Sequence, residues 1–229
     1  LADAEPYAIT VSVVPNVDTP PYIPADGESK FYLTYTLSDR YGNPSGNQTM
    51  QFTDDVIRDV FTQRTNSNGQ IMFTFGPFDT VATFTIHAES VENDSVAIDQ
   101  IVRFTNTSPE EMLLTANPQS MPSADVSGAT GANILAKVTD ENGNGVPGEW
   151  VDFWVIDKSY CDAQTGTPGL DDAKALTDSD GIATMHFNPG FFETDNSDVN
   201  YSATASECCT VVAMWGVKSR SIDLEWKNY

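Results

Sequence analysis

The feature that most constrains the fold of this chain is an internal repeat. The segment LSDRYGNPSGNQTMQF (residues 37–52) is matched by VTDENGNGVPGEWVDF (residues 138–153), with Asp, Gly, Asn and Phe recurring at one constant offset. A second segment, TNSNGQIMFTF (residues 65–75), is matched by TDSDGIATMHF (residues 177–187) at a larger offset. A repeat of this length predicts two copies of one small domain, joined end to end.

The two predicted domains comprise residues 1–107 and 108–229, with a linker near Thr105–Glu110. The offset grows between the two matched segments, which indicates an insertion in the second copy. We therefore expect the second domain to carry insertions near residues 157–173 and 207–218, where its sequence departs from that of the first.

Short segments in which branched or aromatic residues alternate with polar ones recur along the chain, with turn signals between them. This pattern is typical of antiparallel β-sandwiches with one packed and one wetted face. The expected strands are Ile9–Val14, Phe31–Leu37, Gln70–Phe75, Thr83–Ala88, Ile134–Thr139, Trp150–Ile156, Ile182–Phe187 and Tyr201–Ala205. Helical periodicity is weak and confined to Asp54–Thr62, where we expect an irregular loop or one to two helical turns. The predicted fold class is all-β.

Composition and charge exclude several classes of function. The chain has 33 acidic and 11 basic residues, a formal net charge of −22, and 40% hydrophobic residues. Such a charge repels phosphate backbones and anionic lipid headgroups, so we expect no nucleic-acid partner and no binding to a membrane surface. No apolar run approaches the ~20 residues of a membrane span. The apolar content is nevertheless sufficient for packed cores.

The order of turn motifs in both copies resembles the bacterial Ig-like group 1 domains found in tandem in invasin- and intimin-like surface proteins. The first copy carries Pro15, Ala25-Asp26-Gly27, Asp39, Gly42-Asn43, Gly46 and Asn66–Gly69. The second copy carries Pro118, Asp140, Gly143-Asn144, Pro147-Gly148, Val151, Phe153 and Asp178–Gly181. It departs from the pattern where DVSGATG replaces the ADG motif. The resemblance implies two tandem Ig-like sandwiches and a non-catalytic role outside the cell.

Catalysis finds little support in the sequence. The chain has only two histidines, His87 and His186, and both fall on predicted strands, where we expect partly exposed structural side chains. No nucleophile elbow, zinc-protease helix, P-loop or dinucleotide fingerprint is present. Pairs of acidic residues arise by chance among 33 acids and specify no glycosidase site. We therefore predict that the chain is not an enzyme.

The three cysteines are Cys161, Cys208 and Cys209. An oxidising compartment favours a disulfide from Cys161 to one of the other two. Strand counting argues against this pairing, because it places the turn after Trp150–Ile156 and the turn before Cys208 at opposite ends of the sandwich. A sandwich is ~20 Å long, whereas a disulfide spans only ~6 Å between Cα atoms. A disulfide, unpaired thiols and intermolecular pairing all remain open at this point.

Acidic turns suggest a calcium site. The turns that contain Asp140, Asp178 and Asp180 are predicted at the end of the second domain that faces the linker, and Glu110 and Glu111 lie in the linker itself. Hard oxygen ligands that converge there would suit Ca²⁺. The alternative is a solvated acidic end. We expect no other cofactor.

Two tryptophans in one predicted strand of the second copy are its most specific indication of a binding surface. In the strand Trp150–Ile156, alternate residues form the core face, so Trp150, Asp152 and Trp154 are expected to point outward. The corresponding residues of the first copy are Thr49, Gln51 and Thr53. Two outward indoles indicate a sugar-stacking platform, a protein interface, or a surface that the insertion of this domain covers.

These observations favour a non-catalytic structural or adhesive protein, a tandem Ig-like module at the cell surface or outside the cell. Its expected partner is another protein or a second copy of the chain, with a glycan as a further possibility. One alternative is a self-assembling subunit of an extracellular filament or pilus held together by strand exchange. Another is a carbohydrate-binding accessory module of a larger enzyme.

Overall fold

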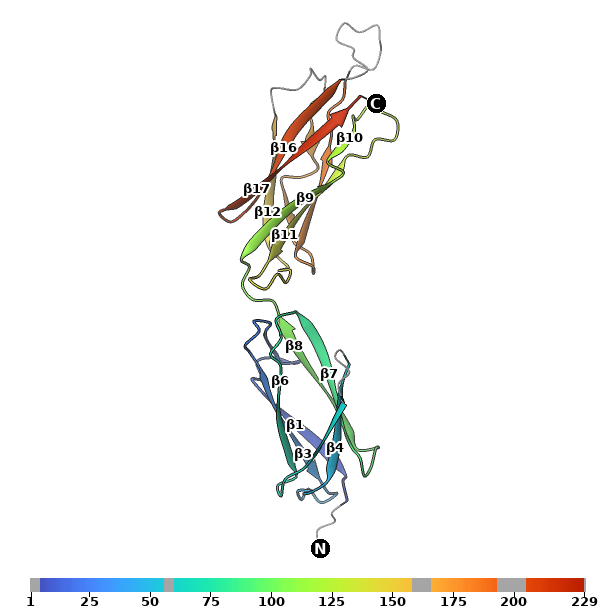
Figure 1. The fold of residues 1–229 in the computed structure, drawn as a ribbon, viewed down its shortest axis with the longest axis vertical. Coiled ribbons are helices and arrows are strands. Elements are labelled where there is room, and N and C mark those ends of the chain that lie inside the picture. The colour runs from blue at the N-terminus through green and yellow to red at the C-terminus, as the bar shows by residue number, and fades with distance from the viewer. Residues whose placement is uncertain (1–4, 56–59, 158–165, 193–204, 229) are drawn as a thin grey trace. The chain divides into compact units, whose positions relative to one another are not determined.

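A computed structural model describes residues 5–55, 60–157, 166–192 and 205–228 (Figure 1). The chain divides into two units, Leu1–Thr107 and Ser108–Tyr229, here called the first and second domains. Every regular element in these ranges is a β-strand, so the all-β prediction is confirmed. Within the same ranges there is no helix that is both long and apolar enough to cross a membrane.

The first domain is a sandwich of two sheets. One sheet has the order β1-β3-β6 and the other β2-β8-β7-β4-β5, with all pairs antiparallel except β2 and β8. The strands are β1 (Ala8–Val14), β2 (Tyr22–Pro24), β3 (Phe31–Ser38), β4 (Thr49–Asp54), β5 (Val60–Arg64), β6 (Gln70–Phe75), β7 (Ala82–Ser90) and β8 (Ala97–Thr105).

The second domain repeats this plan with the sheets β13-β15-β11-β9 and β10-β17-β16-β12-β14. The strands are β9 (Glu111–Asn117), β10 (Ser120–Pro122), β11 (Ala132–Thr139), β12 (Trp150–Asp157), β13 (Gly169–Leu170), β14 (Lys174–Leu176), β15 (Ile182–Asn188), β16 (Ser206–Trp215) and β17 (Lys218–Lys227). Strand β12 therefore holds the place that β4 holds in the first domain, between an edge strand and a long hairpin.

Each domain has its own core because alternate residues of every long strand face inward. In β3, Phe31, Leu33, Tyr35 and Leu37 are almost fully buried, and the residues between them are partly or fully exposed. The same period of two buries alternate residues of β11, and Trp226 on β17 is fully buried in the second core. Burial of side chains of this size stabilises a domain by ~1.5–3 kcal/mol each before entropy is counted.

The repeated sequence motifs are turn chemistry. Asp39, which is 2% exposed, follows β3 and accepts hydrogen bonds from the backbone N–H groups of Tyr41 (2.9 Å) and Asn43 (2.9 Å). The repeated glycine of the second motif passes close to this turn. A Cβ at Gly69 would lie 2.4 Å from the carbonyl oxygen of Leu37, and the equivalent Gly181 is equally confined. Only glycine fits there, which explains why both copies carry it.

Two sequence-based expectations about this fold need correction, and a third lies mostly outside the described ranges. The loop or short helix expected over Asp54–Thr62 needs correction at its two ends, because Asp54 ends β4 and Val60 begins the edge strand β5. Residues 56–59 of this segment lie outside the described ranges. Residues 207–218 are not an insertion, because they form most of the regular β16–β17 hairpin. Of the expected strand Tyr201–Ala205, residues 201–204 lie outside the described ranges, and Ala205 precedes β16.

The difference between the domains near residues 157–173 is also visible. In the first domain, β4 continues into its edge partner β5. In the second domain, the chain forms β13 on the opposite sheet before it returns as β14 beside β12. Residues 158–165 lie outside the described ranges.

Candidate binding site on the second domain

Strand β12 places two indoles on the outer surface of its sheet. Val151 and Phe153 are buried, at 0% and 3% exposure, while Trp150 and Trp154 are 54% and 38% exposed. Alternation along a strand accounts for this arrangement, since side chains at even and odd positions point to opposite faces. Both rings thus keep a large exposed fraction, while residues 158–165 of the expected insertion lie outside the described ranges.

Strand β14 completes this surface. Its residues Lys174 and Leu176 pair with Asp152 and Trp150 of β12. The Nζ atom of Lys174 lies 4.6 Å from the ring centroid of Trp150, within the range of a cation–π interaction. We call this surface the tryptophan face, and it comprises Trp150, Asp152, Trp154, Ile156, Lys174 and Leu176.

A shallow hollow of about 410 Å³ opens beside Trp154, where the pairing of β14 with β12 ends. The loop that leads into β14 forms its other wall, and the backbone carbonyl of Ala173 accepts a hydrogen bond from the N–H of Phe153 (2.7 Å). The lining residues are Phe153, Trp154, Val155, Pro168, Gly169, Leu170, Asp172 and Ala173. Sequence reasoning missed this hollow because its walls come from segments whose pairing is not local.

The carboxylates proposed for calcium are engaged within their own turns. Asp140, which is 2% exposed, accepts hydrogen bonds from the N–H groups of Asn142 (3.0 Å) and Asn144 (2.9 Å). Asp178 accepts them from the N–H groups of Asp180 (2.9 Å) and of the residue that begins β15 (3.0 Å). Across the parts of the chain that the structure describes, no three Asp, Glu, His or Cys side chains form a group that could hold a metal ion. The calcium site remains a sequence-based expectation, and these hydrogen bonds already engage the carboxylates of Asp140 and Asp178.

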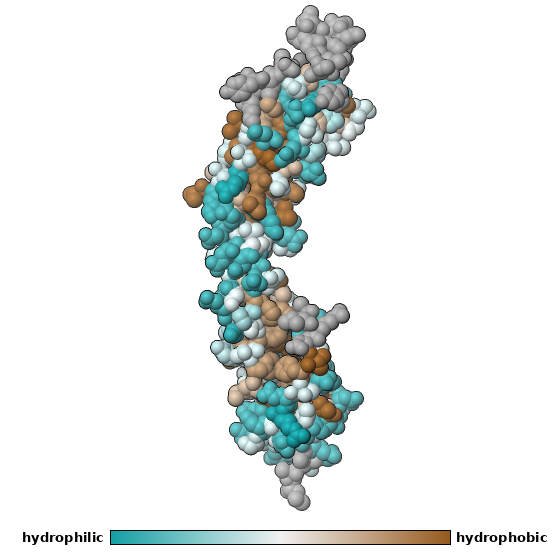
Figure 2. All heavy atoms as spheres, viewed as in Figure 1, coloured by the Kyte–Doolittle hydropathy of each residue, from teal (hydrophilic) through white to brown (hydrophobic). Residues whose placement is uncertain are grey.

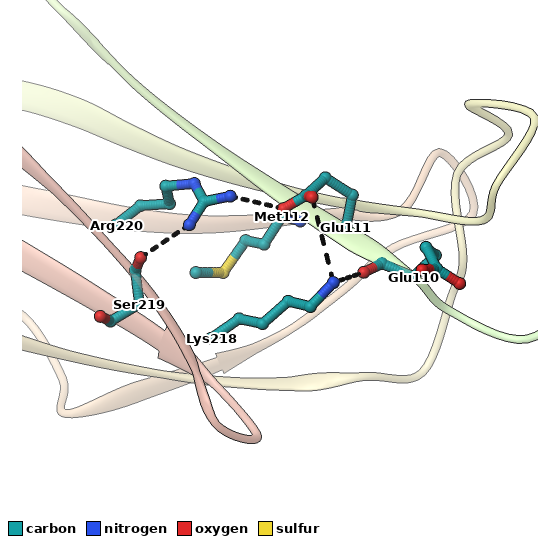
Figure 3. A network of polar contacts seen from close by, with 6 residues as sticks. All are labelled: Glu110, Glu111, Met112, Lys218, Ser219 and Arg220. Carbon is teal, nitrogen blue, oxygen red and sulfur yellow. Dashed lines mark hydrogen bonds and ion pairs between the residues drawn. The ribbon is translucent and has the colours of Figure 1, made fainter.

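The two linker glutamates meet cations instead (Figure 3). The side chain of Arg220 contacts Glu111 at 2.5 Å, and the ammonium of Lys218 lies 3.9 Å from the same carboxylate and donates to the carbonyl oxygen of Glu110. A hydrogen bond from the backbone N–H of Met112, together with these two positive charges, holds the pKa of Glu111 below its ordinary value. This network fastens the start of β9 to β17.

The acidic turns and Glu110 do lie at one end of the second domain. The N–H of Val138 donates to the carbonyl of Gly181 (2.8 Å), and the N–H of Glu110 donates to the carbonyl of Thr139 (2.7 Å). Figure 2 shows hydrophilic residues over this end, where β9 begins, and hydrophobic residues over the middle of the domain.

The cysteines divide into two environments. Cys208 is disulfide-bonded, whereas Cys209 keeps a thiol and is fully buried in the second core. Cys161 lies outside the described residues. The strand count that opposed a disulfide was wrong, because β16 runs antiparallel to β12 with Asp157 opposite Cys209, so the start of β16 lies beside the end of β12.

Both histidines are partly exposed and lie on strands. The Nδ1 atom of His87 is 2.7 Å from the carboxylate of Asp99, and Nε2 is 3.6 Å from that of Glu89. The hydrogen bond with Asp99 raises the pKa of His87, against the opposing effect of partial burial. His186 contacts the side-chain oxygen of Asn133 at 3.2 Å. These contacts give each histidine a structural role between neighbouring strands.

Neither a protein-family model nor a curated protein sequence matches this chain. Among solved structures, InvD of Yersinia pseudotuberculosis is similar at 17% identity, over 94% of this chain and 57% of InvD, with a TM-score of 0.51. InvE, an adhesin of the same organism, is similar at 15% identity over 95% of this chain and 58% of InvE, with a TM-score of 0.44. Invasin, a bacterial integrin-binding protein, is similar at 16% identity over 95% of this chain and 39% of invasin, with a TM-score of 0.41.

These comparisons concern fold. The chain has the all-β architecture of the Ig-like domains of invasin- and intimin-like adhesins, as its turn motifs suggested. It spans less than two thirds of the length of each of these three proteins.

Proposed function

We propose that this chain is a non-catalytic Ig-like module of a cell-surface or extracellular protein with an adhesive or structural role. The observation that carries the proposal is that the chain forms two compact all-β units, each with its own hydrophobic core. A fold likeness to InvD supports it. So does the disulfide at Cys208, because such bonds persist in oxidising compartments and are rare in the cytosol.

Surface location is tested on intact cells of the organism that encodes the chain. Antibodies raised against the first domain should label unpermeabilised cells, and brief protease treatment of these cells should remove the signal. A cytosolic enzyme serves as the control that must stay unlabelled and intact. Recovery of the chain only from the cytosol, with Cys208 reduced, would contradict the proposal.

A self-assembling filament subunit is a second candidate, and one observation favours it. All five residues of the edge strand β5 are exposed, including Val60 at 56% and Phe61 at 39%. An exposed, apolar edge strand is a template for pairing with another chain. Light scattering coupled to size exclusion, with electron microscopy of the same sample, should then show oligomers of the unaltered chain. The Val60→Lys variant should be a monomer in the same measurements. Monomers at high protein concentration would argue against this candidate.

A further inference from the structure

We propose that the tryptophan face binds an uncharged hexose-based glycan, with the rings of Trp150 and Trp154 stacking on sugar rings. This inference rests on the proposed adhesive role, for which it supplies a ligand class. The two indoles lie on one strand, four positions apart, and hence ~13 Å apart along it. Both are substantially exposed. The face thus offers two flat aromatic platforms on one rigid element.

The fold itself does not require these indoles. In the first domain, β4 occupies the place of β12, with Thr49 and Thr53 where β12 has Trp150 and Trp154. Thr49 is paired with an edge strand in the same way as Trp150. A sandwich of this plan therefore forms with threonines at these positions, and we infer that the indoles serve something that they contact outside the sheet.

The polar groups of the face match the chemistry of a sugar. A pyranose presents an apolar face of C–H groups and a rim of hydroxyls. The indoles suit the apolar face, and the carboxylates of Asp152 and Asp172 accept hydrogen bonds from hydroxyls. Asp152 lies between the two indoles on β12, and Asp172 lines the hollow beside Trp154. Stacking surfaces and acceptors are therefore interleaved along one line.

The size of the face favours a small ligand over a protein. The exposed fractions are 54% for Trp150, 38% for Trp154, 50% for Ile156 and 47% for Leu176. If each side chain offers at most ~250 Å², the four together present less than about 500 Å². A stable protein interface buries ~800 Å² per partner, of which a little over half, about 450 Å², is non-polar, so the face lies near the lower limit of what a protein partner needs. A drug-like apolar ligand also fits poorly, since such ligands are buried over ~70–90% of their surface in deep pockets.

The charge of the protein selects among glycans. A net charge of −22 repels sialylated, sulfated and uronic-acid polymers, and the carboxylates of Asp152 and Asp172 repel them locally. An uncharged polymer meets no such barrier. One positive charge also lies at this face, since the ammonium of Lys174 is 4.6 Å from the ring centroid of Trp150.

The test is an array of uncharged oligosaccharides printed beside sialylated and sulfated ones: α- and β-glucans, mannans, galactans and N-acetylglucosamine oligomers. We expect the full chain to bind at least one uncharged series and none of the anionic ones. The double variant Trp150→Thr/Trp154→Thr, which copies the first domain, should lose at least 10-fold in affinity. The matched control, Thr49→Ala/Thr53→Ala, should bind like the unaltered chain. Circular dichroism and thermal unfolding verify that both variants fold.

Three results would overturn the proposal. One is that the full chain binds no uncharged glycan on the array. Another is that the folded double variant binds as well as the unaltered chain. The third is that the unaltered chain binds no glycan and is a dimer by light scattering, whereas the double variant is a monomer. That result would make the face a protein interface. If the double variant does not fold, acrylamide quenching of the unaltered chain replaces it as the test. A bound oligosaccharide should then protect the indole fluorescence from quenching, and an absence of protection would overturn the proposal. Each of these outcomes leaves the test of surface location unaffected.

Discussion

Replacing Thr177 by Val is expected to destabilise the second domain by about 2 kcal/mol with almost no change of shape. Thr177 follows β14 and is only 4% exposed. Its hydroxyl donates a hydrogen bond to the carbonyl of Val146 (2.8 Å) and accepts one from the N–H of Glu149 (2.9 Å). Valine has the same shape but makes neither bond, so the substitution isolates the two hydrogen bonds from packing.

The magnitude follows from the two lost partners. A typical hydrogen bond contributes ~1 kcal/mol net, and a buried group that is left unsatisfied costs ~1–3 kcal/mol, which gives a total of roughly 2–3 kcal/mol. For a domain of this size, that loss lowers the melting temperature by about 8 °C. Because Glu149 directly precedes Trp150, the change should also loosen the start of the tryptophan face and raise the quenching of its indole fluorescence.

The assay is scanning calorimetry with a control inside the same chain. Thr65 is the equivalent residue of the first domain, where its hydroxyl donates to the carbonyl of Ser45 (2.8 Å) and accepts from the N–H of Gln48 (3.0 Å). Thr65→Val should lower only the transition of the first domain, and Thr177→Val only that of the second, since the cores are separate. A loss below about 0.5 kcal/mol in both variants would refute the assignment of these hydroxyls as structural.

Three further predictions concern the pH dependence of the first domain, the disulfide at Cys208 and the thiol of Cys209. Because Asp99 raises the pKa of His87, the stabilisation that this pair gives is complete below the ordinary histidine pKa near 6.5 and is lost as pH rises through the raised value. The melting temperature of the first domain should therefore fall between pH 6 and pH 8.5 by more in the unaltered chain than in Asp99→Asn, and equal falls would count against the pair. Reduction of the disulfide at Cys208 should destabilise the second domain by ~2–4 kcal/mol and leave the first unchanged. The buried thiol of Cys209 should react with Ellman's reagent only on unfolding, and fast reaction in the native protein would contradict its burial.

The parts of the fold that sequence reasoning predicted are those set by local physics. Alternation with a period of two fixes which face of a strand is buried, so the long strands β3, β11 and β12 could be located within a residue or two. The motif that contains Asp39 fixes its turn through hydrogen bonds to residues two and four positions further along the chain. Both kinds of signal lie in residues that are close together in the sequence, which is why the repeat indicated the fold.

The parts that sequence reasoning missed depend on contacts between distant segments. The ion pair of Glu111 with Arg220 joins the first and last long strands of the second domain. No pattern in the residues around either side chain predicts this pair. The calcium hypothesis counted the acids near Glu111 but not Lys218 and Arg220, which face its carboxylate from β17. The short strand β13 has two residues and pairs with the opposite sheet, so it carries no periodic signal. The β5 edge strand was mistaken for a loop because its flanking residues mimic a helical stripe.

The contrast between β4 and β12 is the strongest reason to treat the tryptophan face as functional. Both strands hold the same place in their sheets, between a long hairpin and an edge strand, although β5 pairs with β4 as far as Thr53 and β14 pairs with β12 only as far as Asp152. Threonine is a good strand former and keeps a wetted face soluble, whereas two exposed indoles invite aggregation. The negative charge that surrounds them opposes this aggregation and also repels anionic ligands. A surface that remains apolar under those conditions suits a ligand that is uncharged, stacks flat and needs little buried area.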